Sequence, residues 1–280
     1  MALVLALLSA VFYGTADFLG GFAARRAPTL AATVWAQGIG FGVALLALPL
    51  FPGVLPSAVE ALWGVGAGLT GGLGVAMLYH GFAVGRVSVI APVTAVCSIA
   101  IPVLVAFGLG ERPGCLAVAG IAVAIASVAL ISRHQDAAVG GSGRRDRSLA
   151  IGLACGVVIG AFFVCLARAG TASGVWPLLI ARAASTAALA GAAGVAKVPI
   201  AIPRGVVPIV VACGVIDMVA NALYLVAVRD GPLGLVATLA SLYPASTVLL
   251  ARVVFRERLQ PMQSVGLACA AAAIVMITSR

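Results

Sequence analysis

Apolar stretches long enough to cross a lipid bilayer follow one another along this chain from end to end. The hydrocarbon core of a bilayer is spanned by about 20 consecutive apolar residues in a helix. In lipid, only a helix or a closed barrel satisfies its own backbone groups, and runs of this length favour helices. Glycine, proline and charged residues punctuate the runs and predict an all-α protein with ten transmembrane helices. These lie near residues 2–22, 29–51, 61–83, 87–109, 114–132, 149–169, 174–195, 205–228, 231–255 and 260–278.

The composition agrees with a membrane location. Of the 280 residues, 63% are hydrophobic and 9% are charged, whereas soluble domains carry roughly 25% charged residues. The formal net charge is +9, but the basic residues stand between the apolar runs, where they set topology rather than bind nucleic acid. The expected partners are therefore the lipid bilayer and a small solute, without nucleic acid.

The two halves of the chain are related by an internal duplication. Residues 88–112 align without a gap on residues 234–258, which places Glu111 on Glu257 at an offset of 146 positions. The same offset relates Gly14 to Gly160 in the first helix of each half. The sequence therefore predicts a first five-helix repeat over 1–133, a polar linker over 134–148 and a second repeat over 149–280.

An odd number of helices per repeat has a topological consequence. Because each repeat holds five predicted helices, the second repeat must cross the membrane in the opposite sense to the first. Inverted repeats of this kind are typical of secondary transporters, which bind their cargo near the middle of the bilayer at the interface of the repeats.

Short motifs in each half add a family resemblance. Ten spans arranged as five plus five, with a Leu-Tyr pair and a closing Glu-Arg in each half, resemble the EamA-type family of the drug/metabolite transporter superfamily. The clearer copy of the motifs consists of Leu223-Tyr224, Gly231-Pro232, Ser241-Leu242-Tyr243-Pro244 and Arg256-Glu257-Arg258. The first helix departs from the family, because it carries Tyr13-Gly14 where a Trp-Gly pair is common. The resemblance implies a bacterial plasma-membrane transporter of amino acids, drugs or other small metabolites.

Three charged residues fall inside the apolar spans away from their ends, where each costs about 2.5–3.5 kcal/mol by insertion scales. They are Asp17, Asp217 and Arg182. Asp17 shares a helical face with Ser9 and Tyr13, and Asp217 shares one with Gly214, Asn221 and Tyr224, because these residues are spaced by three or four positions. The faces are interpreted as walls of a water-accessible cavity. The alternative is hydrogen bonding between helices that serves structure alone.

Arg182 and the proline-containing helices extend this site. Arg182 is expected to reach the membrane interface or to form a structural ion pair. Its functional alternative is a counter-ion for Asp17, for Asp217 or for a carboxylate on the cargo. Pro244 interrupts the span 231–255, and Tyr243 beside it completes the predicted cavity residues: Tyr13, Asp17, Asp217, Asn221, Tyr224 and Tyr243.

Enzyme, metal and cofactor motifs are missing from the sequence. It contains no GxSxG, Walker or HExxH pattern, its six cysteines form no CxxC pair, and its two histidines stand far apart. The sequence therefore predicts a transporter without a cofactor, working by alternating access and open to proton coupling through either aspartate. The rival hypothesis is a membrane scaffold, or an intramembrane enzyme that uses Asp17 and Asp217.

Overall fold

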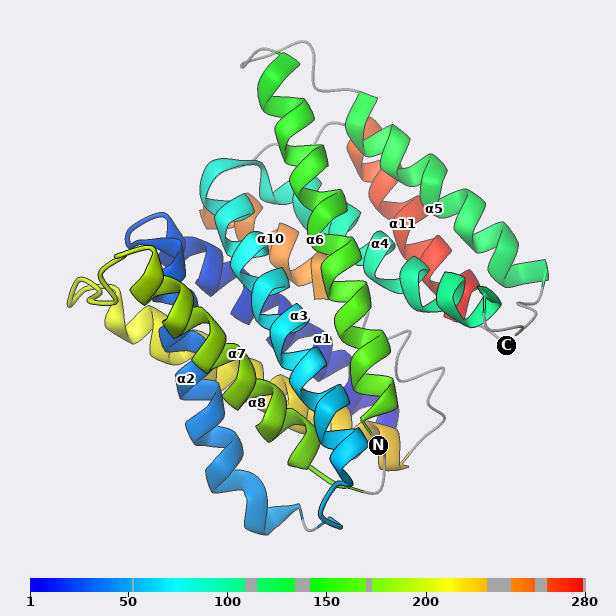
Figure 1. Ribbon diagram of the computed structural model, residues 1–280. Coiled ribbons are helices and arrows are strands. Elements are labelled where there is room, and N and C mark those ends of the chain that lie inside the picture. The colour runs from blue at the N-terminus through cyan, green and yellow to red at the C-terminus, as the bar shows by residue number, and fades with distance from the viewer. Residues whose placement is uncertain are drawn as a thin grey trace.

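The computed structural model describes residues 1–51, 53–108, 115–133, 142–169, 173–230, 243–254 and 261–278. All regular structure in these ranges is helical (Figure 1). The first half contains α1 (Ala2–Ala24), α2 (Thr29–Ala47), a 3₁₀ turn η1 (Leu48–Leu50), α3 (Ala58–Val84), α4 (Val87–Gly108) and α5 (Cys115–Arg133). The second half contains α6 (Ser142–Arg168), α7 (Trp176–Val195), α8 (Val207–Asp230), α10 (Tyr243–Val254) and α11 (Pro261–Thr278). The first part of the predicted span 231–255 lies outside the described residues.

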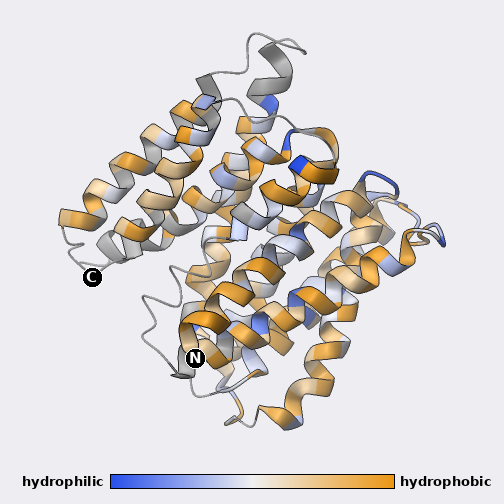
Figure 2. Ribbon diagram, turned by 180° about the vertical axis from the view of Figure 1, so that it is seen from behind, coloured by the Kyte–Doolittle hydropathy of each residue, from blue (hydrophilic) through white to orange (hydrophobic). Residues whose placement is uncertain are grey.

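Six of the described helices are long and apolar enough to cross a membrane by length and composition: Ala2–Ala24, Thr29–Leu50, Ala58–Val84, Arg147–Leu166, Trp176–Val195 and Val207–Tyr224. Figure 2 shows hydrophobic residues along most of the helices and hydrophilic residues gathered mainly at their ends. Large apolar side chains such as Leu62 and Leu69 of α3 are exposed, as expected for a surface that faces lipid.

Two helix ends differ from the sequence prediction for local reasons. α2 ends at Ala47 rather than near residue 51, because Pro49 cannot donate a helical hydrogen bond and its ring opposes the preceding turn. α3 begins at Ala58 rather than residue 61, because Ser57 and Glu60 form a reciprocal capping box ahead of the apolar run.

The helix predicted over 149–169 begins earlier in the structure than the sequence indicated. α6 begins at Ser142, so residues 142–148 are helical. Arginine has a high helix propensity, and the apolar span that follows has already met the cost of helix nucleation. Extra turns can therefore continue beyond the span, and composition alone does not reveal them.

The packing of the helices repeats at the sequence offset of 146. α1 packs on α8 and on α10, and its equivalent α6 packs on α3 and on α4, which are the equivalents of those two helices. A Cβ on Gly14 would lie 2.9 Å from the backbone nitrogen of Thr247, and a Cβ on Gly160 would lie 2.9 Å from Cγ1 of Ile101. These four positions form two equivalent pairs, so the two halves pack about an approximate two-fold axis.

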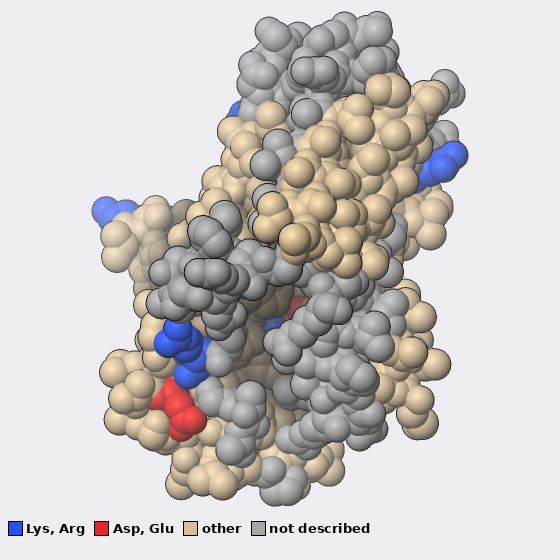
Figure 3. Space-filling view, turned by 90° about the vertical axis from the view of Figure 1, so that its right-hand side faces the viewer, with Lys and Arg blue, Asp and Glu red and all other residues tan. Residues whose placement is uncertain are grey.

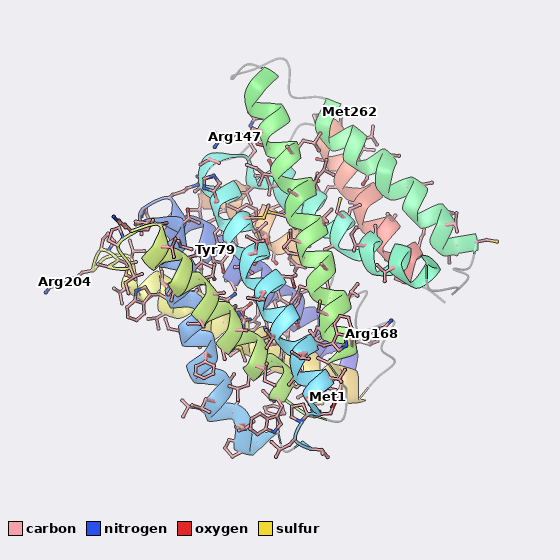
Figure 4. The ribbon with its side chains drawn as sticks, viewed as in Figure 1. Met1, Tyr79, Arg147, Arg168, Arg204 and Met262 are labelled. Carbon is pink, nitrogen blue, oxygen red and sulfur yellow. The ribbon has the colours of Figure 1, made fainter. Side chains whose placement is uncertain are left out.

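The outer helices and the chain ends fit the same arrangement. α5 and α11, the last helices of the two halves, lie side by side along one edge of the molecule (Figure 1). In Figure 4, Arg147 and Arg168 mark the two ends of α6, and Met1 at the start of α1 lies toward the Arg168 end. α1 and α6 therefore run in opposite senses, as an inverted repeat requires.

Candidate functional site

A polar network joins three helices in the interior of the bundle. Arg182 of α7 donates one hydrogen bond from NH1 to Oε1 of Gln37 in α2 and another from NH2 to Oδ2 of Asp217 in α8. Asn221 donates from Nδ2 to the backbone oxygen of Asp217 at 2.7 Å and to its Oδ2 at 3.5 Å. The side chains of Arg182 and Asp217 are 15% and 22% exposed, so the ion pair is screened from bulk solvent without being sealed.

The helices bring these groups together through small residues. Gly214 lies one turn before Asp217, and a Cβ there would lie 2.7 Å from the carbonyl oxygen of Ala36. The backbones of α2 and α8 therefore approach closely at this point, which brings Asp217 opposite Gln37. Gly40 lies one turn after Gln37, and its backbone leaves room for the stem of Arg182.

Figure 3 shows a hollow in one face of the molecule, with acidic and basic atoms visible inside it. The described acidic side chains are those of Asp17, Glu60 and Asp217, and Glu60 belongs to the exposed capping box of α3. Charges in a low-dielectric interior persist where they are paired or reached by water, and this site offers both conditions.

Asp17 lies on α1, which packs against α8. Two hydrogen bonds fix the α1 backbone around it: Ser9 donates from Oγ to the oxygen of Ala220 at 2.9 Å, and Cys213 donates from Sγ to the oxygen of Ala16 at 3.3 Å. Its half-buried carboxylate makes no hydrogen bond or ion pair with any residue that the structure describes.

The tyrosines among the predicted cavity residues lie in different places. Tyr13 is half-buried, one turn before Asp17. Tyr243 lies at the start of α10, where its carbonyl oxygen accepts a hydrogen bond from Ser246 at 2.8 Å. Tyr224 packs with Ala2, Leu5 and Ala6 of α1. It lies seven residues, or about 10 Å, along α8 from Asp217. The three tyrosines thus stand on α1, α8 and α10, and α1 packs on both of the other helices.

Three polar residues next to this site were not among the predicted cavity residues. Gln37 is 3% exposed and accepts from Arg182. The hydroxyl of Tyr79 lies 3.2 Å from Sγ of Cys213, and the ring of Tyr79 fills the space beside Gly20. Of the three, Gln37 gives the clearest sequence signal, because it is an amide in the middle of an apolar run, but the prediction followed the helical faces of Asp17 and Asp217 and the proline-containing helices.

The polar network does not follow the two-fold relation of the fold. At the sequence offset of 146, Arg182 corresponds to Ala36 and Gln37 to Ala183, while Asp217 corresponds to Gly71 and Asn221 to Val75. All four equivalents are apolar or glycine. The network therefore occurs at only one of the two positions that the two-fold relation makes equivalent. This argues that the packing of the helices does not require these polar groups.

The described residues offer no alternative polar site. No group of three or more His, Cys, Asp or Glu side chains that could hold a metal ion occurs within the described ranges. An apolar pocket lies between α2, α7 and α8 and is lined by Val43, Ala47, Phe51, Val175, Leu178, Met218, Val219 and Ala222. It offers no polar group to orient a ligand.

In a comparison with known proteins, both halves of the chain match the same family model. A family model described as the EamA-like transporter family matches residues 1–133 and again residues 147–279. A crystal structure that is 18% identical in sequence shares the fold with a TM-score of 0.65, over 98% of this chain and 95% of the other. No functionally curated protein matches the sequence.

Proposed function

Because the chain belongs to the EamA-like transporter family, we propose that it is a secondary transporter that moves a small metabolite across the membrane by alternating access. In this proposal all ten helices cross the bilayer, as two inverted five-helix repeats. The cargo is an amino-acid-like or drug-like solute, and the protein resides in the bacterial plasma membrane as a multi-pass protein.

The observation that supports this proposal best is the charged network inside the bundle. A membrane scaffold has no use for an arginine, two aspartates and a buried glutamine among its interior helices, because each ionised group costs free energy there. The apolar equivalents of Arg182, Gln37, Asp217 and Asn221 in the other half-site indicate that the same helix packing forms without such groups. A polar cavity for cargo explains why the charges are retained.

Each predicted cavity residue has a role in the proposal. Asp217, held by Arg182, Gln37 and Asn221, forms the fixed wall of the cavity. Asp17, which makes no hydrogen bond or ion pair with a described residue, faces the cargo or carries a proton during the cycle. Tyr13, Tyr224 and Tyr243 contribute aromatic walls at different depths. An intramembrane enzyme would need both aspartates free to act on a substrate, and the engagement of Asp217 by Arg182 argues against that role.

The test is solute flux in proteoliposomes that contain the purified protein, with a panel of labelled metabolites. The expected result is saturable uptake or counterflow of at least one solute, and its loss in Asp17→Asn and in Asp217→Asn. Glu60→Gln is the matched control, because it alters a carboxylate at the exposed start of α3 and leaves the interior unchanged. Absence of flux for every solute, with a folded and correctly inserted protein, would favour the scaffold.

A further inference from the structure

The charges inside the bundle do not cancel. Among the described side chains, those charged within the middle of the helices are Asp17, Arg182 and Asp217. Arg182 is paired with Asp217, so Asp17 is an acidic group with no basic partner among the described side chains. The titratable tyrosines and cysteines of the neighbouring helices are neutral in their ordinary protonation states at pH 7; they are Tyr13, Tyr79, Tyr243, Cys155 and Cys213.

Arg182 is poorly placed to receive an anion. Both terminal nitrogens of its guanidinium group already donate to oxygen atoms, one of Gln37 and one of Asp217. Asn221 holds Asp217 through the same carboxylate oxygen and through its backbone. A carboxylate on the cargo would have to break a charge-assisted bond and would leave Asp217 unpaired beside Asp17, a second uncompensated charge.

Asp17 is placed to receive a cation. The α1 backbone around it is fixed by the bond that Ser9 donates to α8, by the bond that Cys213 of α8 donates to Ala16, and by the close fit of Gly20 against Tyr79. The carboxylate therefore has a defined position and no described partner. Tyr13 shares its helical face one turn away, and aromatic rings next to a carboxylate favour an ammonium group.

Building on the proposed transport function, we propose that this protein selects solutes that carry a single positive charge, such as an amine or amidine, and that Asp17 receives the charged group. The Arg182–Asp217 pair, held by Gln37 and Asn221, stays closed and keeps Arg182 from attracting anions. Charge selectivity then comes from residues that break the two-fold relation of the fold. The positions equivalent to Arg182, Gln37, Asp217 and Asn221 are Ala36, Ala183, Gly71 and Val75, and none of these is charged.

The charge of the cavity can be measured without knowing the cargo. In a cysteine-depleted protein, Tyr13→Cys places a thiol one turn from Asp17, and its reaction rates with a cationic and an anionic methanethiosulfonate are compared, each divided by the rate with a free thiol in solution. One uncompensated charge at about 10 Å in a medium of effective dielectric near 20 changes the local concentration of a monovalent ion by about tenfold. The cationic reagent is therefore expected to react at least about tenfold faster.

Substitution of the two aspartates should shift this ratio in steps. With Asp17→Asn the ratio is expected to fall toward one, and with Asp17→Asn/Asp217→Asn it should reverse in favour of the anion, because Arg182 is then unpaired. Asp17→Glu keeps the charge and should keep the ratio, which serves as control if the double variant does not fold. An anion-preferring or unselective native protein, or failure of both reagents to reach the thiol, would overturn the proposal.

A binding measurement separates this inference from the transport function. Thermal stabilisation of the purified protein is recorded with phenylethylamine and with its alcohol and carboxylate analogues, phenylethanol and phenylpropionate. Stabilisation by the amine that is lost in Asp17→Asn supports the inference even if no solute crosses proteoliposomes. Flux of anions that is unaffected by Asp17→Asn would support the proposed transport function but refute the inference about positively charged solutes.

Discussion

At the scale of single residues, removal of either partner of the Arg182–Asp217 pair is expected to cost free energy of folding. Both side chains lie in a low-dielectric interior, where the loss of one partner leaves an uncompensated charge. Gln37 and Asn221 satisfy further hydrogen bonds of the pair, so the network is a unit rather than a sum of independent contacts. Substitutions within it should therefore be strongly non-additive.

Arg182→Met alone is expected to lower the free energy of unfolding by about 3–5 kcal/mol, because Asp217 is left unpaired. Arg182→Met/Asp217→Leu should recover most of this loss, since a buried pair replaced by apolar groups is often neutral for stability. Unfolding of the purified variants in detergent, arranged as a double-mutant cycle, measures the coupling. Additive effects of the two substitutions would show that the groups do not form a pair in the folded protein.

At the scale of helices, small residues set how closely the elements approach. Gly68 of α3 faces α7, where an added Cβ would overlap the carbonyl oxygen of Ala181 and lie 2.8 Å from Cβ of Ala184. Its equivalent, Gly214 of α8, has the same role against α2. The backbones at these two crossings are thus in contact, and neither has room for a side chain.

Gly68→Ala should therefore destabilise the protein by about 1–3 kcal/mol, the usual cost of overpacking. The matched control is Gly191→Ala in α7, where an added Cβ would meet nothing within 4 Å. The control should be neutral or stabilising by up to about 1 kcal/mol, because alanine is the better helix former. Thermal unfolding of both variants checks the pair, and equal effects would contradict the close packing of α3 on α7.

The helices were largely predictable from sequence, whereas the site was predictable only in part. Apolar length and the offset of 146 place most ends of the described helices within a few residues, because the bilayer fixes span length; the start of α6 is the exception. Spacing along one helix also puts Asp217 and Asn221 on one face. It does not say which helix lies opposite, so the choice of Asp217 over Asp17 as the partner of Arg182, and the part played by Gln37, depend on three-dimensional packing.

At the scale of the whole molecule, the charges outside the bundle predict its orientation. Twelve of the basic residues follow odd-numbered predicted spans and four follow even-numbered spans or form the C-terminus. Basic residues favour the cytoplasm, so both termini are expected outside and residues 134–141 inside. Gly141→Cys in a cysteine-depleted protein should resist an impermeant maleimide on intact cells and react after permeabilisation. Labelling of intact cells would reverse the orientation.

The two halves are also packed unequally, and this bears on the transport cycle. α3 packs on α1 and α2, where Arg25 donates from Nε to the oxygen of Phe82 at 2.8 Å and Tyr79 lies against Gly20. Its equivalent α8 meets α7 at the Arg182–Asp217 pair and where Met218 packs with Leu179, but between the described residues it makes no comparable approach to α6. If transport proceeds by alternating access, exchange of roles between the repeats should bring α8 against α6 and release α3 from α1.

This exchange predicts a contact that the present conformation lacks. Leu166 of α6 is the equivalent of Gly20 at the offset of 146, and Tyr224 aligns with Tyr79 when the two Leu-Tyr motifs are matched, at an offset of 145. In a cysteine-depleted protein, Leu166→Cys/Tyr224→Cys should crosslink in only a fraction of the molecules, and the addition of cargo should change that fraction. Gly21→Cys/Phe82→Cys, at a contact already present, should crosslink without cargo and respond to cargo in the opposite direction. Crosslinking is the readout, so the loss of transport that Tyr224→Cys could cause does not affect the result. Parallel changes in the two pairs would mean that the two gates do not alternate.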